Sequence, residues 1–331
     1  MNKFLLTFAA LAIIFSPITA QKAFAIWNDA TTNFATVGII DLNTANSTAN
    51  FVNTGFYFTS NTTETYNSTG ATSSTYNPAT GLISYIATEA SSGIVHLNTV
   101  DTNTWKLFNS SKVMNMNLGN LAYDQTADPY NIFATITTGD GYLYVTKLSA
   151  SDSNYKVIDK IPNVYPNATG TFIANNNYYA VCFVNSTGLT NCNYYTLDGV
   201  VVNRYNYQAT GVAYPWVPFS APYMLTYLPQ QKATLCLVFL QNKSYADFYG
   251  RYQFFWLSSN SQLVDTYWSL QLVGKHYYGS LFGDFSLPRV YQFVMDGSDP
   301  NPYMQTYSTY NNQWVKTQKA NNFVLNAWGF V

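Results

Sequence analysis

Residues 74–108 read STYNPATGLISYIATEASSGIVHLNTVDTNTWKLF, and this stretch sets the pattern that most of the chain follows. Short runs of β-branched and aromatic residues alternate here with turn signals at Pro78, Gly81, Gly93 and Asn103. Runs of this kind, bounded by Gly, Pro and Asn, are typical of short strands joined by tight turns. The stretch therefore predicts four strands in up-and-down order, at residues 74–77, 82–86, 93–97 and 105–108.

The same order of four strands recurs along the chain. Units comparable to the first begin near residues 121, 171, 223 and 281, at spacings of 47, 50, 52 and 58 residues. A single four-stranded sheet of this length cannot bury both of its faces, so neighbouring units must pack against one another. The repeat therefore predicts a set of stacked sheets.

The two ends of the chain complete this pattern. Residues 24–27, 37–41 and 49–52 make only three strands, and residues 323–331 make one strand without a unit of its own. With the C-terminal strand innermost beside these three, the chain resembles a six-bladed β-propeller closed by strands from both termini. The resemblance concerns the fold alone, since no unit carries a WD or kelch signature. The alternative fold is a pair of β-sandwiches.

The N-terminus has the composition of a secretory signal peptide. Lys3 precedes an uncharged apolar run at 4–15, which is about 18 Å long as a helix and too short to cross about 30 Å of hydrocarbon. Small residues then follow, which suits cleavage after Ala20, with Ala25 as the second choice. The chain thus divides into a signal peptide, 1–20, and one propeller domain, 21–331. No later segment contains 18 consecutive apolar residues, so no membrane span is predicted. We therefore expect a secreted protein.

The composition excludes several classes of function. Charged residues make up 9% of the chain and the formal net charge is −1, which excludes nucleic-acid binding driven by phosphate neutralisation. With 18% aromatic residues, the chain is also unlike a disordered protein. There are only two histidines, His96 and His276, and the motifs H-x-x-x-H, C-x-x-C and G-x-S-x-G are absent, so no zinc site or serine nucleophile is predicted.

If the protein is secreted, its Asn-X-Ser/Thr sequons become candidate sites of N-linked glycosylation. If the host is a eukaryote, glycans on these sites would hydrate a surface that has few charges. The seven predicted sites are Asn46, Asn61, Asn67, Asn109, Asn167, Asn185 and Asn242.

The three cysteines predict one disulfide. Cys182 and Cys192 flank a turn signal at 185–188, so they would face each other across a hairpin, at a separation that a disulfide can bridge. Cys236 lies in an apolar run and is expected to be a buried free thiol. The alternative is that all three thiols are buried and reduced.

Acidic residues offer only a weak case for catalysis. Asp124 and Asp284 each follow the first strand of a unit, and Asn77 is the matching residue of another unit. These side chains would suit a calcium or acid/base cluster, or they would simply start hairpin turns. Because these three residues occupy equivalent positions in repeated units, a role in starting hairpin turns is favoured over a calcium or acid/base cluster. We therefore predict no cofactor, and calcium stays open as the alternative.

A candidate binding face follows from the predicted topology. In a propeller, the connections between fourth and first strands share one face with those between second and third strands. Loop aromatic and histidine residues expected there are Tyr165, Tyr214, Trp216, His276, Tyr277 and Tyr278, and the acids expected there are Glu89, Asp140 and Asp296. Flat apolar rings beside polar groups suit a glycan or a partner protein, with Trp216 as the largest expected contributor. The alternative is that these side chains only fill the channel.

Two classes of function remain. The first is a secreted glycoprotein that acts as a non-catalytic binding module for a glycan or an extracellular protein. The alternative is a secreted calcium-dependent hydrolase or lactonase on the same scaffold. Propellers support both classes, so the fold does not decide between them. The shortage of glutamate, with only Glu64 and Glu89, and of histidine favours the binding module.

Overall fold

The computed structural model describes residues 22–28, 35–42, 50–57, 62–63, 74–89, 92, 94–113, 117–124, 130–150, 154–162, 164–185, 190–210, 216–218, 224–242, 250–257, 262–271, 276–284, 287–296 and 302–330. The regular elements within these ranges are strands, numbered β1 to β26. None of the described residues belongs to a helix with the length and hydropathy that a membrane crossing requires.

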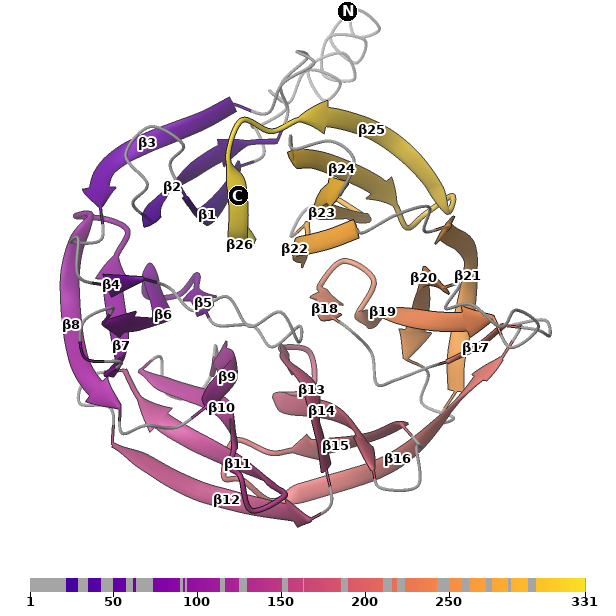
Figure 1. Cartoon of the computed structure of the whole chain (residues 1–331), viewed down its shortest axis with the longest axis horizontal. Coiled ribbons are helices and arrows are strands. Elements are labelled where there is room, and N and C mark those ends of the chain that lie inside the picture. Colours follow the sequence, from indigo (N-terminus) through magenta and orange to yellow (C-terminus); the bar gives the residue numbers. More distant parts are fainter. Residues whose placement is uncertain are drawn as a thin grey trace, which may run out of the picture.

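The strands form six blades around a central axis (Figure 1), and the predicted β-propeller is confirmed. In order from the axis outward, blade A comprises β26 (Phe323–Phe330), β1 (Lys22–Asn28), β2 (Ala35–Asp41) and β3 (Asn50–Tyr57). Blade B comprises β4 (Thr62–Thr63) with β5 (Ser74–Asn77), then β6 (Leu82–Glu89), β7 (Val95–Asp101) and β8 (Lys106–Val113). Blade C comprises β9 (Asn117–Tyr123), β10 (Asn131–Thr137), β11 (Tyr142–Ser149) and β12 (Tyr155–Pro162).

The second half of the ring follows the same order. Blade D comprises β13 (Val164–Ile173), β14 (Tyr178–Asn185), β15 (Thr190–Tyr195) and β16 (Val201–Thr210). Blade E comprises β17 (Trp216–Pro218) with β18 (Met224–Leu228), then β19 (Ala233–Asn242), β20 (Gly250–Leu257) and β21 (Gln262–Gln271). Blade F comprises β22 (His276–Gly283), β23 (Arg289–Asp296), β24 (Pro302–Ser308) and β25 (Gln313–Lys319).

The ring closes through the C-terminal strand, as the sequence predicts. Strand β26 pairs antiparallel with β1, from Phe323 opposite Asn28 to Phe330 opposite Lys22. Figure 1 shows β26 on the inner side of β1, next to blade F. Because β1 then pairs with β2, the N-terminal strand lies inside the sheet and has no free edge.

Among the described residues, the buried apolar side chains form six clusters, one at each seam between neighbouring blades. Aromatic rings fill these seams. At the seam of blades C and D, for example, Phe133 stacks on Tyr179 with ring centroids 5.0 Å apart. The high aromatic content thus serves the packing of one sheet on the next, as expected for sheets about 10 Å apart.

The innermost strands carry an irregularity that the sequence does not predict. In every blade, the ladder between the innermost and second strands is bulged or broken partway along. In blades B and E the break is complete, so β4 and β5 pair with different parts of β6, and β17 and β18 with different parts of β19. Bulges increase local twist, which suits strands that crowd around one axis.

Blades D and E are joined at their outer edges. Strand β16 extends to Thr210, and its last three residues pair in parallel with β21 from Gln262 to Val264. The two blades therefore form one nine-stranded sheet. The alternation of residue types does not indicate pairing between different blades, so this extension of β16 is not predictable from the sequence.

The predicted disulfide is confirmed. Cys182 and Cys192 are directly opposite each other on β14 and β15, with their Cα atoms 4.0 Å apart, and they form a disulfide. Cys236 is a buried free thiol whose Sγ donates a hydrogen bond to the Phe255 carbonyl oxygen at 3.2 Å. Burial raises the pKa of this thiol, so it stays protonated and packs as a small apolar side chain.

Blade F contains a buried amide that we expect to be replaceable. Gln292 is 1% exposed, and its amide atoms have no hydrogen-bond partner among the described residues. An unpaired buried polar group costs about 1–3 kcal/mol, so Gln292→Leu is expected to leave the melting temperature unchanged or to raise it. Gln231→Leu is the control, because the Gln231 Oε1 atom accepts a 2.7 Å hydrogen bond from Thr309 and its loss should lower the melting temperature. A lower melting temperature for Gln292→Leu than for Gln231→Leu would contradict this account.

Candidate functional site

The blade register brings the predicted site residues to one end of the strands. We call this end the upper face: it is where the innermost strands begin and the second strands end. His276 is opposite Asp296 in blade F, Trp216 is opposite Asn242 in blade E, and Thr62 is opposite Glu89 in blade B. Residues that are far apart in sequence thus share this face.

Most of the predicted residues lie in strands, whereas the sequence analysis expected them in loops. Tyr165 is the second residue of β13, Trp216 begins β17, and residues 276–278 begin β22. Glu89 and Asp296 are the last residues of β6 and β23. The expectation was wrong because aromatic runs at the edge of a predicted loop also suit a strand, and here they extend the ladder. Tyr214 lies outside the described residues.

Asp140 lies where the sequence predicts, in the turn between β10 and β11, and its carboxylate organises that turn. Its Oδ1 atom accepts hydrogen bonds from the Thr138 hydroxyl and, at 3.2 Å, from the Tyr142 backbone N–H. Its Oδ2 atom accepts a 2.9 Å hydrogen bond from the Tyr144 hydroxyl. These hydrogen bonds, the one from Thr138 foremost, lower the pKa of Asp140, and the charge of Lys160 contributes in the same direction.

Lys160 completes an exposed group on this blade. Its ammonium Nζ lies 3.8 Å from the ring centroid of Tyr142 and 5.2 Å from that of Tyr144, which is cation–π geometry. Hydrogen bonding to Tyr144, together with the nearby charges, raises the pKa of Lys160. We call these residues the blade C cluster: Thr138, Asp140, Tyr142, Tyr144 and Lys160. It presents a carboxylate, two partly exposed rings and an ammonium group to solvent.

The sequence analysis found only Asp140 of this cluster. Tyr142 and Tyr144 follow Asp140 at intervals of two residues, a spacing that places them on the same face of a strand. That signal was present in the sequence. Lys160 joins them because β12 pairs with β11 so that Lys160 is opposite Tyr144, and this register is not visible in the sequence.

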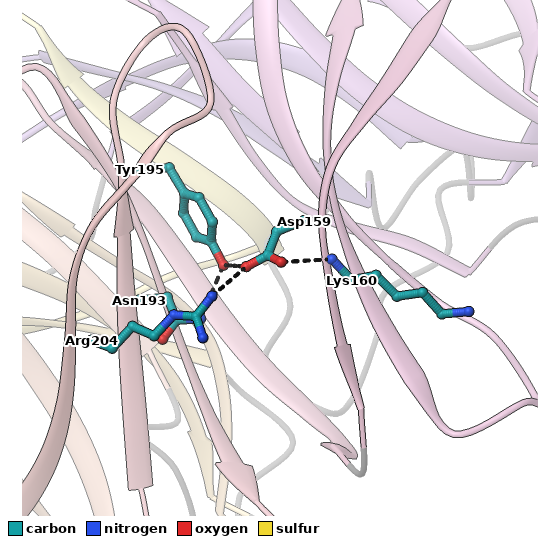
Figure 2. Close-up of polar contacts among 5 residues, drawn as sticks. All are labelled: Asp159, Lys160, Asn193, Tyr195 and Arg204. Atoms are coloured by element: carbon teal, nitrogen blue, oxygen red, sulfur yellow. Dashed lines mark hydrogen bonds and ion pairs between the residues drawn. The ribbon is translucent and has the colours of Figure 1, made fainter.

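A second polar network joins blades C and D (Figure 2). The Asp159 Oδ2 atom accepts a 2.8 Å hydrogen bond from the Tyr195 hydroxyl and lies 3.7 Å from the guanidinium of Arg204. Its Oδ1 atom accepts a 2.8 Å hydrogen bond from the Lys160 backbone N–H. Asn193 Nδ2 donates to the Tyr195 hydroxyl at 3.1 Å. Burial, and then the charge of Asp159, raises the pKa of Tyr195.

This network is a structural link. A bulge in β12 places Asp159 opposite Val145 while Val157 is opposite Thr146, and bulges redirect side chains in this way. Both carboxylate oxygens of Asp159 have donors, and the Arg204 side chain is 66% exposed, so the ion pair itself adds little stability. The network therefore links the two blades across their seam.

The acids at the lower ends of the first strands belong to turns. The Asp284 carboxylate accepts a 3.0 Å hydrogen bond from the Leu287 backbone N–H and a 2.9 Å hydrogen bond from the Tyr291 hydroxyl. Asn77 accepts a 2.9 Å hydrogen bond from the Ala79 backbone N–H, and Asp124 is fully buried. The contacts of Asp284 and Asn77 support the turn interpretation. In the part of the chain that the structure describes, no three His, Cys, Asp or Glu residues gather as a metal site would require.

Comparison with known proteins identifies the fold. No protein-family model and no curated protein matches the chain. Among solved structures, TolB from Acinetobacter baumannii superposes with a TM-score of 0.58 at 10% identity, over 98% of this chain and 71% of that one. A prolyl endopeptidase superposes with a TM-score of 0.52 at 8% identity, over 94% of this chain and 52% of that one, so this chain spans about half of the enzyme's length. At such identities the similarity concerns the fold alone.

Proposed function

We propose that this chain is a secreted glycoprotein that acts as a non-catalytic binding module, and that a glycan binds at the blade C cluster on the upper face. One observation carries the proposal. The cluster places a hydrogen-bonding carboxylate, two tyrosine rings and an ammonium group together on an exposed surface. Sugar hydroxyl groups need such acceptors and donors, and the apolar faces of sugar rings pack on aromatic planes.

The acids whose contacts are known favour binding over catalysis. Asp159 and Asp284 are held by structural hydrogen bonds at a seam and in a turn. A glycosidase needs two carboxylates positioned on either side of the scissile bond, and a covalent mechanism needs a nucleophile beside a base. Asp140 has its own donors and forms neither pair with the described side chains around it.

Two features support secretion. A disulfide is typical of proteins that fold in an oxidising compartment, and the first 20 residues have the order of a signal peptide. Strand β1 begins at Lys22, and Ala23 and Ala25 are fully buried within it. Cleavage after Ala25 would remove the first four of the seven residues of β1, whereas cleavage after Ala20 leaves the strand whole.

We therefore expect the mature chain to begin at Gln21. Intact-mass measurement and N-terminal sequencing of protein secreted from a eukaryotic host would check this position. A mature chain that begins at Ile26 would contradict the role assigned to β1 in ring closure.

The ligand site is tested by Asp140→Asn. This change keeps the shape of the side chain, removes its charge and weakens the acceptor for Tyr144, so we expect glycan affinity to fall about tenfold. The measurement is a glycan-array screen of the native protein, followed by titration of its best ligand. Because the pKa of Asp140 is lowered, affinity should be unchanged at pH 5 and should fall only below the usual carboxyl pKa of about 3.9.

The control for this test is Asp198→Asn, which changes an exposed acid in a lower-face turn and should bind like the parent. Equal loss in both variants would refute the site. An array without any bound glycan would refute the glycan ligand, and an extracellular protein captured only when Asp140 is intact would replace it.

A further inference from the structure

Most of the exposed apolar side chains among the described residues lie on three adjacent blades. Ten large apolar side chains are at least 40% exposed, and seven of these ten belong to blades B, C and D. Leu107 is set apart from the other six, because it is opposite Val100, which packs in the seam between blades A and B. We call the other six the rim patch: Phe108, Tyr130, Tyr155, Val157, Val200 and Val202.

The order of the strands brings the rim patch to one part of the surface. In each blade the second and the outermost strands begin at the lower end, and the six residues lie within three residues of such a start, at β8, β10, β12 or β16. Figure 1 shows β8, β12 and β16 following one another along the outer rim of the ring. The rim patch therefore lies on the lower outer rim, away from the blade C cluster on the upper face.

Contacts between the blades hold this surface in shape. Phe108 of blade B stacks on Tyr130 of blade C with ring centroids 6.2 Å apart, yet the two side chains remain 48% and 43% exposed. Between blades C and D, the Lys147 Nζ atom donates a 2.7 Å hydrogen bond to the Leu197 carbonyl oxygen, in the turn before β16. The surface is therefore preformed, and a partner that binds it has little chain to order.

The charges within the rim patch have both signs. Lys156 is exposed between Tyr155 and Val157, and Asp198 is exposed in the turn before Val200. In a contact with two-fold symmetry the same surface is present on both copies, so a surface with both signs can be complementary to itself. The formal net charge of −1 adds little repulsion between two copies. These features favour a second copy of the chain over a strongly charged partner.

The exposed area also suits a symmetric contact. Because the six side chains are about half exposed, they present on the order of 500 Å² of apolar surface. Patches of this size on soluble proteins often mark interaction sites. A symmetric contact would bury about twice this area, or about 1,000 Å², which is the lower bound of a specific interface.

We propose that two copies of this chain associate through the rim patch, related by a two-fold axis. Side chains make this contact and strand pairing does not, because β12 has Lys156, Pro162 and a bulge, which are features that prevent edge-to-edge pairing. Since the contact lies at the lower rim, the blade C clusters of both copies stay accessible to ligand.

The test is analytical ultracentrifugation of the secreted protein over a wide range of concentration. The parent should form a reversible dimer with a Kd of about 10–100 µM, as expected for an interface near the lower size bound. Val157→Asp places a charge within the rim patch and should weaken the dimer at least about tenfold. Val315→Asp is the matched control, because Val315 is 50% exposed on the outermost strand of blade F and Val157 is 44% exposed on that of blade C.

Both variants replace exposed side chains, so both should melt near the parental temperature. If Val157→Asp does not fold, Tyr155→Ser makes the same test with a smaller change in polarity, and it should also weaken the dimer. A parent that stays monomeric up to about 1 mM would overturn the inference, and binding of that monomer to phospholipid vesicles would assign the rim patch to a lipid surface instead. A dimer that both Asp variants weaken equally would place the contact elsewhere and would also overturn it.

Discussion

Deletion of residues 323–331 is expected to abolish secretion of folded protein. Strand β26 pairs along the whole of β1, and Val324 is fully buried in the cluster that also contains Trp27. Without β26, the edge of β1 and the apolar seam between blades A and F are exposed, which favours aggregation. The lost contacts exceed what a fold with a net stability of about 5–15 kcal/mol can tolerate.

The measurements for this deletion are the secreted yield and the aggregated fraction in the cell. Tyr310→Ser is the control, because this side chain is 85% exposed in a turn of blade F and the variant should be secreted like the parent. A monomeric deletion variant that is secreted normally and melts at the parental temperature would contradict the closed ring.

Substitution of Asn120 is expected to have the second largest effect. Asn120 is buried at the bulge of β9 with a positive φ of 54°. Its Nδ2 atom donates to the Thr135 hydroxyl at 2.8 Å and to the Ala168 carbonyl oxygen at 3.1 Å, and its Oδ1 atom accepts from the Gly170 N–H at 3.1 Å. One side chain therefore ties blade C to the innermost strand of blade D.

Asn120→Ala should lower the free energy of unfolding by at least about 3 kcal/mol. Part of the cost is the left-handed backbone, at about 1–2 kcal/mol, and the rest is the buried groups that lose their partners, at about 1–3 kcal/mol each. Asn177→Ala measures the cost of the left-handed backbone conformation alone, because Asn177 has a φ of 56° in an exposed turn. Denaturant unfolding of both variants measures the loss in unfolding free energy. Equal losses in the two variants would refute the role of the Asn120 side chain in linking blades C and D.

Local signals made the blades predictable. The strand at residues 74–77 was predicted with its observed bounds, because the turn after it contains Pro78 and Gly81. The disulfide was predictable for the same reason, since a short turn fixes the register of a hairpin. The closing strand followed from counting strands, because a ring of four-stranded blades needs one more strand at its N-terminus.

Features that depend on contacts between blades were not predictable. The split of the innermost strand into β17 and β18, and the parallel pairing of β16 with β21, arise where strands crowd the axis or meet at the rim. The candidate site was only partly predictable for the same reason. Asp140 was found through the order of connections, whereas Lys160 joins it through the register of β11 and β12.

The most direct test of the binding face is a hydrogen-exchange footprint of the bound glycan. The account predicts slower exchange on ligand binding in residues 138–144 and 158–162, which contain the blade C cluster. It predicts no change in the lower-face turns at 101–105 and 196–200. Protection confined to those lower turns, or a saturating ligand that leaves residues 138–144 unprotected, would contradict the account.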